Sequence, residues 1–484
     1  MRHLLDHTSG LADLHLWQLF TVRASPDDAL RDHLVRPGQR LHARTRPGAQ
    51  FLYSNVGYTL LGLLIEAATG ERYEHWVDRN VLLPLGMTRS TMTFVSQEGV
   101  RADRTLAMGH FDGFTPQAAY AIPVRPAAQF TTTPSDMARL IRFLMSDGTV
   151  NGRVLVDRAL LRAMGEASTT DAVRAGLAGG YGLGLVTRER WGSTGRCHLG
   201  NVGTFRAMLC VHRDQQRGVF VAYNSDPESL PWDAVDSLVV AALRLPAEAA
   251  VPVAPLSVDA DAWRGWYLAQ PRFEQFAYLD VLGSAVRASW DGQRFVLAPL
   301  GGMSRTLEPV GGRSLRLVGR RAATHVLLRA GDTLRITDGQ RTLTRVPVAM
   351  LLAYWSSAAV GAVALLALLG VGGVRTWRAA RSGGVRREPL RWIAGAMLLL
   401  LASAPLHLLQ PALAIGDATT ATVTTAFATG AVPIALAGSA LSTMREWQRL
   451  TRVRRWCDAL ALLGAGQWVA VLAWWGLMPL VLWR

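Results

Sequence analysis

The residues best suited to do chemistry stand directly before a strongly apolar stretch of the chain. Tyr53, Ser54 and Asn55 precede residues 56–68, in which apolar side chains cover nearly every face. This pattern predicts a helix buried in a domain core, with Asn55 as its N-cap and Gly70 at its end. Tyr53 and Asn55, held at the entrance of a rigid helix, could form one preorganised side of a catalytic site. The alternative is that Asn55 only caps the helix and Tyr53 only packs.

The triplet is accompanied by other motifs in a characteristic order. They are LLDHTSGLAD (4–13), QFTTTPSDMARLIRFLM (129–145), GGYGLGLV (179–186) and CHLGNVGTFRAML (197–209). Over roughly residues 1–245 the chain resembles the penicillin-recognising serine hydrolases, a family of class C β-lactamases, D,D-carboxypeptidases and related esterases. Each motif alone is weak evidence, whereas several in order are strong evidence.

The resemblance implies a role for five residues. Tyr53 would be the proton-shuttling base or part of its network, and Asn55 would hold the substrate's amide oxygen. His198 stands where many members have lysine, and Gly200 would allow close approach of the substrate to a strand edge. The backbone N–H of Asn201 would form one half of an oxyanion hole.

The same resemblance implies acyl-enzyme chemistry on an ester or amide: a cell-wall peptide, a β-lactam or a small ester. A histidine can be neutral near pH 7, so His198 would favour esters or uncharged amides over classical β-lactams. The partners expected are therefore a small-molecule ester or amide, or a peptidoglycan peptide. No cofactor and no metal are expected, because the sequence has neither an HExxH motif nor clustered His/Cys spacing.

The family's nucleophile motif, S-x-x-K, is missing from the sequence. All 51 basic residues are arginine, so no lysine is present to complete that motif. Ser9, Ser54 and Ser135 sit in other motifs and are poor substitutes. Residues 1–10 also lack the basic and apolar regions of a signal peptide. We therefore expect a gene start placed too late, with a signal peptide and S-x-x-K upstream, and a chain that is inactive as written.

Two other hypotheses remain open. The first is a pseudoenzyme that binds cell-wall peptides without cleaving them. The second is a transporter or sensor whose working part is a membrane domain with an external cap. The second is weaker, because the apolar segments lack intramembrane charges and paired broken helices.

The spacing of apolar residues changes along the sequence and divides the chain into parts. Residues 1–245 place helices before short β-rich runs, which predicts an α/β (α+β) β-lactamase/transpeptidase-like domain with an antiparallel sheet. A Pro/Ala-rich linker follows at 246–256. Residues 257–346 alternate in polarity between D-G and G-D turns, which predicts a small all-β domain, a sheet or barrel. We interpret it as a packing or substrate-excluding module.

The last part predicts an all-α domain of four transmembrane helices, which agrees with the high apolar content of the chain. The four segments are each apolar over about 20 residues and lie near 348–373, 392–412, 420–441 and 459–483. Arginines crowd the connections 374–391 and 445–455, while the connection around Asp417 has none. The positive-inside rule then places both arginine-rich connections in the cytoplasm, and residues 1–346 and the C-terminus outside the cell membrane.

The net charge of +15 is explained by this topology and by membrane lipid as a partner. No nucleic-acid partner is expected, because the basic residues form no aromatic-interleaved patch. In the second segment, His407 and Gln410 are not expected to form a proton relay. Cys197 and Cys210 could face each other across a hairpin centred near Gly203, as a disulfide or as two free core cysteines.

Overall fold

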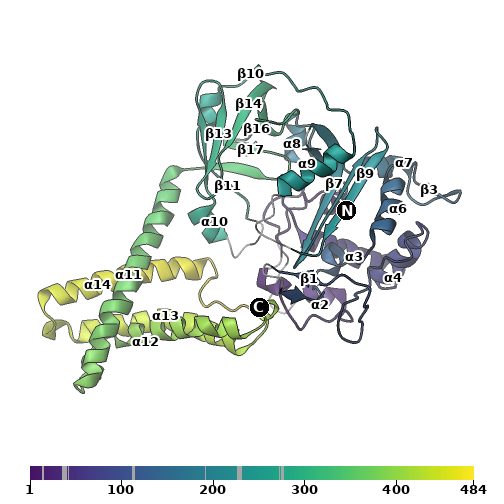
Figure 1. Cartoon of the computed structure of the whole chain (residues 1–484). Helices are drawn as coiled ribbons and strands as arrows, with labels where there is room; N and C mark the ends of the chain where they lie inside the picture. The colour runs from purple at the N-terminus through teal and green to yellow at the C-terminus, as the bar shows by residue number, and fades with distance from the viewer. Residues whose placement is uncertain are drawn as a thin grey trace. The chain divides into compact units, whose positions relative to one another are not determined.

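The computed structural model describes residues 1–13, 16–34, 41, 43–111, 115–190, 192–225, 232–271, 273 and 277–483. It divides into two compact units (Figure 1). The first comprises residues 1–14, 24–272 and 284–345. The second comprises residues 15–23, 273–283 and 346–484.

The first unit contains a five-stranded antiparallel sheet in the order β5-β6-β7-β8-β9. The strands are β5 (Gly180–Tyr181), β6 (Val186–Arg190), β7 (Ser193–Val202), β8 (Phe205–His212) and β9 (Arg217–Tyr223). Gly and Asp turns separate these strands, as the sequence predicts. Among the described strands β9 bonds only to β8, so its other edge carries no strand.

Cys197 and Cys210 lie opposite each other on β7 and β8 and form a disulfide. Of the two arrangements that the sequence leaves open, the structure has the bridge. Both side chains are buried, at 0% and 3% exposure, in a cluster with Phe51, Tyr181 and Val186. The disulfide therefore ties the two central strands of the sheet together beside that cluster.

The helix after the Tyr53 triplet, α3, runs over Asn55–Thr69. Its N-cap is Ser54, whose hydroxyl accepts from the amide of Gly57 at 3.2 Å, so the expectation that Asn55 is the cap is wrong. The cap needs an extended backbone, and Ser54 has it while Asn55 is already helical. Gly70 ends the helix in the left-handed conformation, as predicted.

The prediction that α3 is buried on every side is also wrong. Its entrance is buried, but its last two turns are half-buried or exposed, and Leu64 is 44% exposed. The neighbouring helices cover one side only, and Gly62 lies so close to Pro126 that a Cβ there would come within 2.5 Å of the proline ring. These neighbours are α1 (Arg2–Leu5), α2 (Leu30–Leu34), α4 (Tyr73–Val77), which continues into the π-helical η2 (Asp78–Leu82), and α5 (Arg125–Ala128).

A buried ion pair joins two of these short helices. Arg125 and Glu74, at 1% and 2% side-chain exposure, meet at 2.8 Å, and Arg72 also reaches Glu74 at 3.1 Å. Removing one partner would leave the other charge buried without a counter-ion. The sequence analysis did not anticipate this pair.

Helix α6 (Pro134–Leu144) begins after Thr133, whose side chain caps it, and Asp136 lies in its first turn. It packs on β8 and β9 (Figure 1). The remaining elements of this part are short, apart from α9. They are β1 (Gly109–His110), β2 (Pro116–Gln117), β3 (Thr149–Val150), β4 (Arg153–Val154), α7 (Arg158–Ala163), α8 (Asp171–Arg174) and α9 (Trp232–Ala242).

The small all-β domain is a barrel. Eight antiparallel strands follow one another in the order β14-β13-β12-β11-β18-β17-β16-β15, and β15 pairs again with β14 to close the ring. Tyr267, Phe295, Leu307, Leu315 and Leu327 are each completely buried in its core, so side chains fill the interior. Closure removes the exposed edges that an open sheet of this size would have.

The barrel strands are β11 (Gly265–Ala269), β12 (Val286–Trp290), β13 (Phe295–Pro299), β14 (Arg305–Gly312), β15 (Ser314–Leu317), β16 (His325–Ala330), β17 (Thr333–Thr337) and β18 (Thr342–Val346). A further strand, β10 (Ala254–Leu256), pairs in parallel with β14. It begins inside the segment that the sequence suggests is a linker. The turn η4 (Ala260–Trp263) lies between β10 and β11.

The second unit contains four helices long and apolar enough to cross a membrane. They are α11 (Val348–Arg381), α12 with η7 (Arg391–Leu409), α13 (Thr420–Arg445) and α14 (Arg452–Trp474). The fourth begins before the predicted start and ends before the predicted end, because Thr451 caps it and Gly476 turns the chain just after it. The unit also holds η1 (Leu16–Leu19), α10 (Ala277–Gly283), η6 (Val385–Arg387), η8 (Ala412–Ala414) and η9 (Trp447–Arg449).

A buried carboxylate organises the connection between α12 and α13. Asp417, 3% exposed, accepts from the Thr21 hydroxyl at 2.5 Å and from the Val22 amide at 2.9 Å. The backbone amide of Gly416 donates to the carbonyl of Phe20 at 2.8 Å. Residues 20–22 are thus held within the second unit, although they lie between motifs of the hydrolase-like region.

His407 and Gln410, which are not expected to form a proton relay, belong to a chain of polar contacts. His407 contacts the Thr425 hydroxyl at 2.8 Å and Gln410 at 3.2 Å, and Gln410 accepts from Thr419 at 2.5 Å. Thr422 extends the chain to the backbone of Asp417 at 2.5 Å. These groups satisfy one another near the helix ends, which supports a structural role.

Candidate active site

The entrance of α3 is held by a carboxylate that the sequence analysis did not single out. One oxygen of Asp13 accepts from the backbone amides of Asn55 at 2.9 Å and Val56 at 3.2 Å. Its other oxygen accepts from the side-chain amide of Asn55 at 2.9 Å. Asp13 is 6% exposed and sits at the positive end of the helix dipole. It therefore fixes both the first turn of α3 and the orientation of Asn55.

Asn55 is also fixed from its other side. The Tyr53 hydroxyl donates to its side-chain oxygen at 3.2 Å. The side-chain nitrogen of asparagine carries two hydrogens, and Asp13 takes one of them. The second hydrogen is the one with which Asn55 would reach a substrate's carbonyl oxygen.

His7 occupies the centre of an aromatic cluster next to this helix entrance. Its Nδ1 accepts from the backbone amide of Ser54 at 3.2 Å, which places the proton on Nε2 in the neutral ring. Its ring lies 4.4 Å from that of Tyr53, 5.1 Å from Tyr58 and 4.7 Å from Tyr181, between centroids. His7 is 2% exposed, and its ring joins that of Tyr53 to that of Tyr181.

The cluster extends to His198 through Tyr181. The rings of Tyr181 and His198 meet edge-on at 6.5 Å between centroids. Tyr53, at the entrance of α3, and His198, on β7, therefore both belong to one chain of ring contacts through His7 and Tyr181. The sequence separates Asn55 and His198 by 143 positions, and folding brings the elements that carry them to this cluster.

The electrostatic character of the cluster is neutral. Burial raises the pKa of the Tyr181 and Tyr58 phenols, and the neighbouring phenols raise them further. Burial lowers the pKa of His198 below its usual value. At pH 7 these three groups are therefore uncharged, because desolvation disfavours the charged form of each.

The strand that carries His198 has an open edge beyond Cys197. The register of β6 with β7 ends at the pair Val186–Cys197, whereas β7 continues with β8 as far as Val202. Gly200 and Asn201 are exposed in this stretch. In the described chain, residues 198–202 therefore bond to a strand on one side only.

The distance between the Cα atoms of the disulfide shows which backbone amides point toward that open edge. The Cα atoms of Cys197 and Cys210 are 4.1 Å apart, which is typical of a pair without hydrogen bonds between its two backbones. The two kinds of pair alternate along an antiparallel ladder, so Asn201 and Arg206 form a pair of the same kind. The N–H of Asn201 consequently points away from β8, toward the open edge.

The described residues around Gly200 leave room for a side chain. A Cβ at this position would find one neighbour, the Ala207 side chain, at an ordinary 3.8 Å. Packing therefore does not explain the glycine, whereas the approach of a substrate to the strand edge would.

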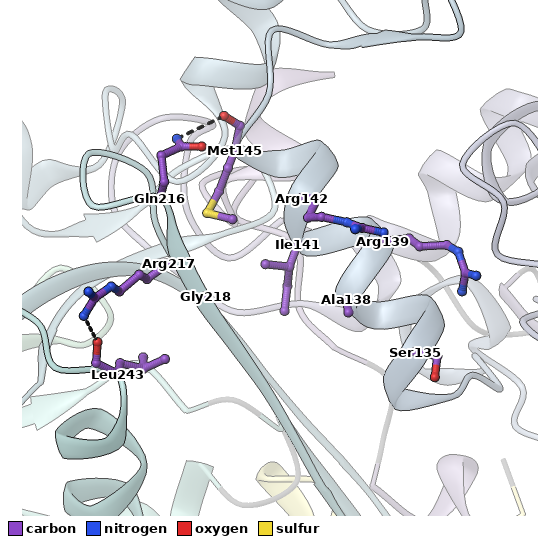
Figure 2. Close-up of a pocket in the computed structure, with 10 residues that line it drawn as sticks. All are labelled: Ser135, Ala138, Arg139, Ile141, Arg142, Met145, Gln216, Arg217, Gly218 and Leu243. Carbon is purple, nitrogen blue, oxygen red and sulfur yellow. Dashed lines mark hydrogen bonds between the residues drawn. The ribbon is translucent and has the colours of Figure 1, made fainter.

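A groove elsewhere in this unit lies between α6 and β9 (Figure 2). It is lined by Ser135, Ala138, Arg139, Ile141, Arg142, Met145, Gln216, Arg217, Gly218 and Leu243. None of the five candidate site residues lines it. Arg217 donates to the Leu243 carbonyl and Arg139 pairs with Asp136, so the groove's polar groups are engaged largely within the protein.

Comparison with known proteins gives the family. The beta-lactamase family model matches residues 1–243, half of the chain. The chain belongs to the beta-lactamase family. A penicillin-binding protein of Bacillus subtilis is similar at 34% identity over 93 residues, covering 19% of this chain and 20% of that protein. Protein flp of Staphylococcus aureus is 25% identical over 240 residues, covering 48% and 44%.

The family member described here thus spans less than half the length of these curated relatives. Among solved structures, SurE is similar at 23% identity with a TM-score of 0.46, covering 71% of this chain and 78% of that one. A D-amino acid amidase from Ochrobactrum anthropi is 21% identical with a TM-score of 0.38, covering 50% and 76%.

Replacing Asp13 tests whether its carboxylate supports the site. We expect Asp13→Ala to lower the first thermal unfolding transition by about 4–8 °C, because about 2 kcal/mol is lost when a helix cap and buried hydrogen bonds disappear. The measurement is intrinsic tryptophan fluorescence of the full chain during heating. Asp103→Ala is the matched control, since the Asp103 carboxylate bonds only to Thr105 on an exposed loop. Equal effects of the two substitutions would contradict the role given to Asp13.

Proposed function

We propose that this chain is the substrate-binding and proton-transfer part of a membrane-anchored serine hydrolase that acts on an uncharged ester or amide through an acyl-enzyme. The observation that carries the proposal is the open edge of β7, where the Asn201 N–H points outward three residues from a neutral His198. Tyr53 belongs to the same chain of ring contacts as His198, and its hydroxyl donates to Asn55. Cell-wall peptides, β-lactams and small esters are the substrate classes that fit this chemistry.

The proposed reaction uses these residues in turn. A serine hydroxyl attacks the substrate carbonyl carbon, and its proton passes to the Tyr53 network. The negative oxygen of the tetrahedral intermediate is held by the Asn201 N–H, while Asn55 positions the substrate's amide oxygen. The leaving alcohol or amine takes the proton, and water then releases the acyl group by the same route.

The serine itself is not assigned within this chain. With no lysine the sequence holds no Ser-x-x-Lys, so we propose that this chain alone forms no acyl-enzyme. The proposed reaction therefore requires a Ser-x-x-Lys from outside this sequence, as in a product extended upstream of Met1.

A second candidate function is a pseudoenzyme that binds cell-wall peptides. The lack of any lysine in the sequence is the observation that favours it. It predicts reversible binding at the same strand edge and no covalent intermediate, whatever precedes the chain. A transporter or sensor role for the membrane helices has no comparable support, since the polar groups around His407 are satisfied by one another.

We propose that the four apolar helices anchor the protein in the cell membrane, with residues 1–346 and the C-terminus on the outer side. The arginine-rich connections between α11 and α12 and between α13 and α14 support this orientation, because the connection between α12 and α13 has no arginine. The disulfide between Cys197 and Cys210 supports it independently, because disulfides persist in oxidising compartments.

Acylation decides between the hydrolase and the pseudoenzyme. We expect a fluorescent penicillin or a fluorophosphonate to leave the 484-residue chain unlabelled and to label the upstream-extended product at the serine of Ser-x-x-Lys. Mass spectrometry of the labelled peptide identifies the residue. An in-frame stop codon directly before Met1, or an extended product that takes no label, would contradict the hydrolase proposal in favour of the pseudoenzyme.

His198 should set the preference for uncharged substrates. In the extended product, we expect His198→Lys to raise turnover of a carboxylate-bearing β-lactam relative to a neutral ester by about tenfold, or about 1.4 kcal/mol, because a permanent cation replaces a neutral ring. Any pH dependence that His198 gives to the unsubstituted protein should have its midpoint below pH 6.5, because burial lowers the pKa of His198 below that usual value. The control is His75→Lys, because His75 is an exposed residue of α4. An unchanged ratio in His198→Lys would contradict this role.

A further inference from the structure

One end of the second unit carries a dense set of arginines. It comprises the end of α11, the beginning of α12, the end of α13 and the beginning of α14. Residues 375–391 and 445–458 contain eleven arginines and three carboxylates, a net charge of +8 (11 − 3). Such a charge density requires counter-ions, either within the protein or from a partner.

The protein neutralises only the inner part of this charge. Arg375 binds both oxygens of Asp458 at 2.7 and 2.8 Å and also reaches Glu388 at 2.9 Å. Arg454 binds the other oxygen of Glu388 at 2.6 Å. Glu388 and Asp458 are 5% and 4% exposed. The two buried carboxylates and these two partly exposed arginines form a cluster that joins α11, the start of α12 and α14.

The remaining arginines surround this cluster as a rim. Arg378, Arg381, Arg387, Arg445, Arg449 and Arg452 are exposed, and Arg391 and Arg455 are half-buried. The third carboxylate, Glu446, pairs with one of them, Arg449, at 3.3 Å. Most of the rim's positive charge is therefore presented outward.

Three rim arginines are held against tryptophan rings. The guanidinium of Arg381 lies 3.9 Å from the ring centroid of Trp377, and that of Arg391 lies 5.0 Å from Trp392. Arg455 lies 5.4 Å from Trp447. Trp377 and Trp392 are themselves 54% and 53% exposed. Stacking fixes each cation at the level where tryptophan prefers to lie in a bilayer, at the boundary of headgroups and acyl chains.

Apolar side chains continue from the rim along the same helices. Val374 on α11, Met444 on α13 and Val453 on α14 are 48%, 70% and 74% exposed. A small soluble phosphate would meet only the arginines. A phospholipid would meet the arginines with its phosphate and these side chains with its acyl chains.

We propose that this rim is a binding site for anionic phospholipid headgroups, anchored by Arg381, Arg391 and Arg455. The proposal rests on the membrane anchoring proposed above and adds a chemical partner at a defined place. Phosphate oxygens accept hydrogen bonds from the guanidinium forks, and the neighbouring tryptophans hold the forks in position. The cluster around the buried Glu388 and Asp458 holds the helix ends together and leaves the rim arginines available for phosphate.

The test measures retained lipid on the full chain. The protein is reconstituted with phosphatidylcholine containing phosphatidylglycerol, extracted in mild detergent, and examined by native mass spectrometry. We expect phosphatidylglycerol to be retained in preference to phosphatidylcholine. The triple variant Arg381→Gln, Arg391→Gln and Arg455→Gln should reduce its retention about tenfold or more, because the lipid phosphate loses the cations that attract it.

Two controls separate charge at this site from charge in general and from misfolding. Arg287→Gln, Arg313→Gln and Arg329→Gln remove the same charge from exposed barrel positions and should change nothing. Replacing the three rim arginines by lysine keeps the charge and should restore most of the retention. Failure of the lysine variant to restore it, or an equal loss in the barrel variant, would overturn the assignment.

The source of the phosphate and the anchoring are tested separately. Excess glycerol phosphate, which has no acyl chains, should not displace the lipid, and displacement would show a site for soluble phosphate instead. Equal retention of both lipids by a membrane-inserted chain would overturn the lipid site alone. A chain found outside the membrane fraction would instead overturn the anchoring proposed above.

Discussion

The candidate active site depends on one buried carboxylate. Asp13 binds the first two amides of α3 and the side chain of Asn55, so the orientation of the helix and that of its polar entrance are set by the same group. A carboxylate at a helix N-terminus is favoured by the helix dipole and satisfies amides that have no partner within the helix. Without Asp13, the side chain of Asn55 would no longer be held in one orientation, and neither would the Tyr53 hydroxyl that donates to it.

The aromatic residues around the entrance of α3 make the site uncharged. Aromatic rings around His7 exclude water and hold Tyr181 against His198. The desolvation that raises the pKa of the tyrosine lowers that of the histidine, so neither carries charge at pH 7. A substrate carboxylate would therefore find no permanent cation at His198, whereas an ester or uncharged amide needs none. In the proposed reaction, the outward N–H of Asn201 would donate to the carbonyl oxygen of such a substrate.

Local sequence signals were sufficient for much of the fold. Gly70 and the Thr133–Pro134–Asp136 start mark helix ends through backbone geometry, and D-G turns mark strand ends. Length and apolar composition were enough to find the four long helices. Each of these signals acts within a few residues, which is why a single sequence contains it.

Contacts between distant residues were the part that the sequence did not reveal. Asp13 and Asn55 are 42 positions apart, and Arg125 and Glu74 are 51 apart. Barrel closure depends on the pairing of β14 with β15 and on strand stagger, which alternation of polarity does not encode. The roles of Tyr53, Asn55, His198, Gly200 and Asn201 still rest on motif and geometry.

The most direct test of the account is an experimental structure of the hydrolase part of the protein with a neutral ester analogue bound. We expect the analogue's carbonyl oxygen to lie about 2.9 Å from the Asn201 amide nitrogen, the usual length of such a hydrogen bond. Tyr53 and Asn55 should contact the same molecule from the entrance of α3, with His198 beside it. An analogue bound away from the β7 edge, or Tyr53 and His198 on separate surfaces, would contradict the account.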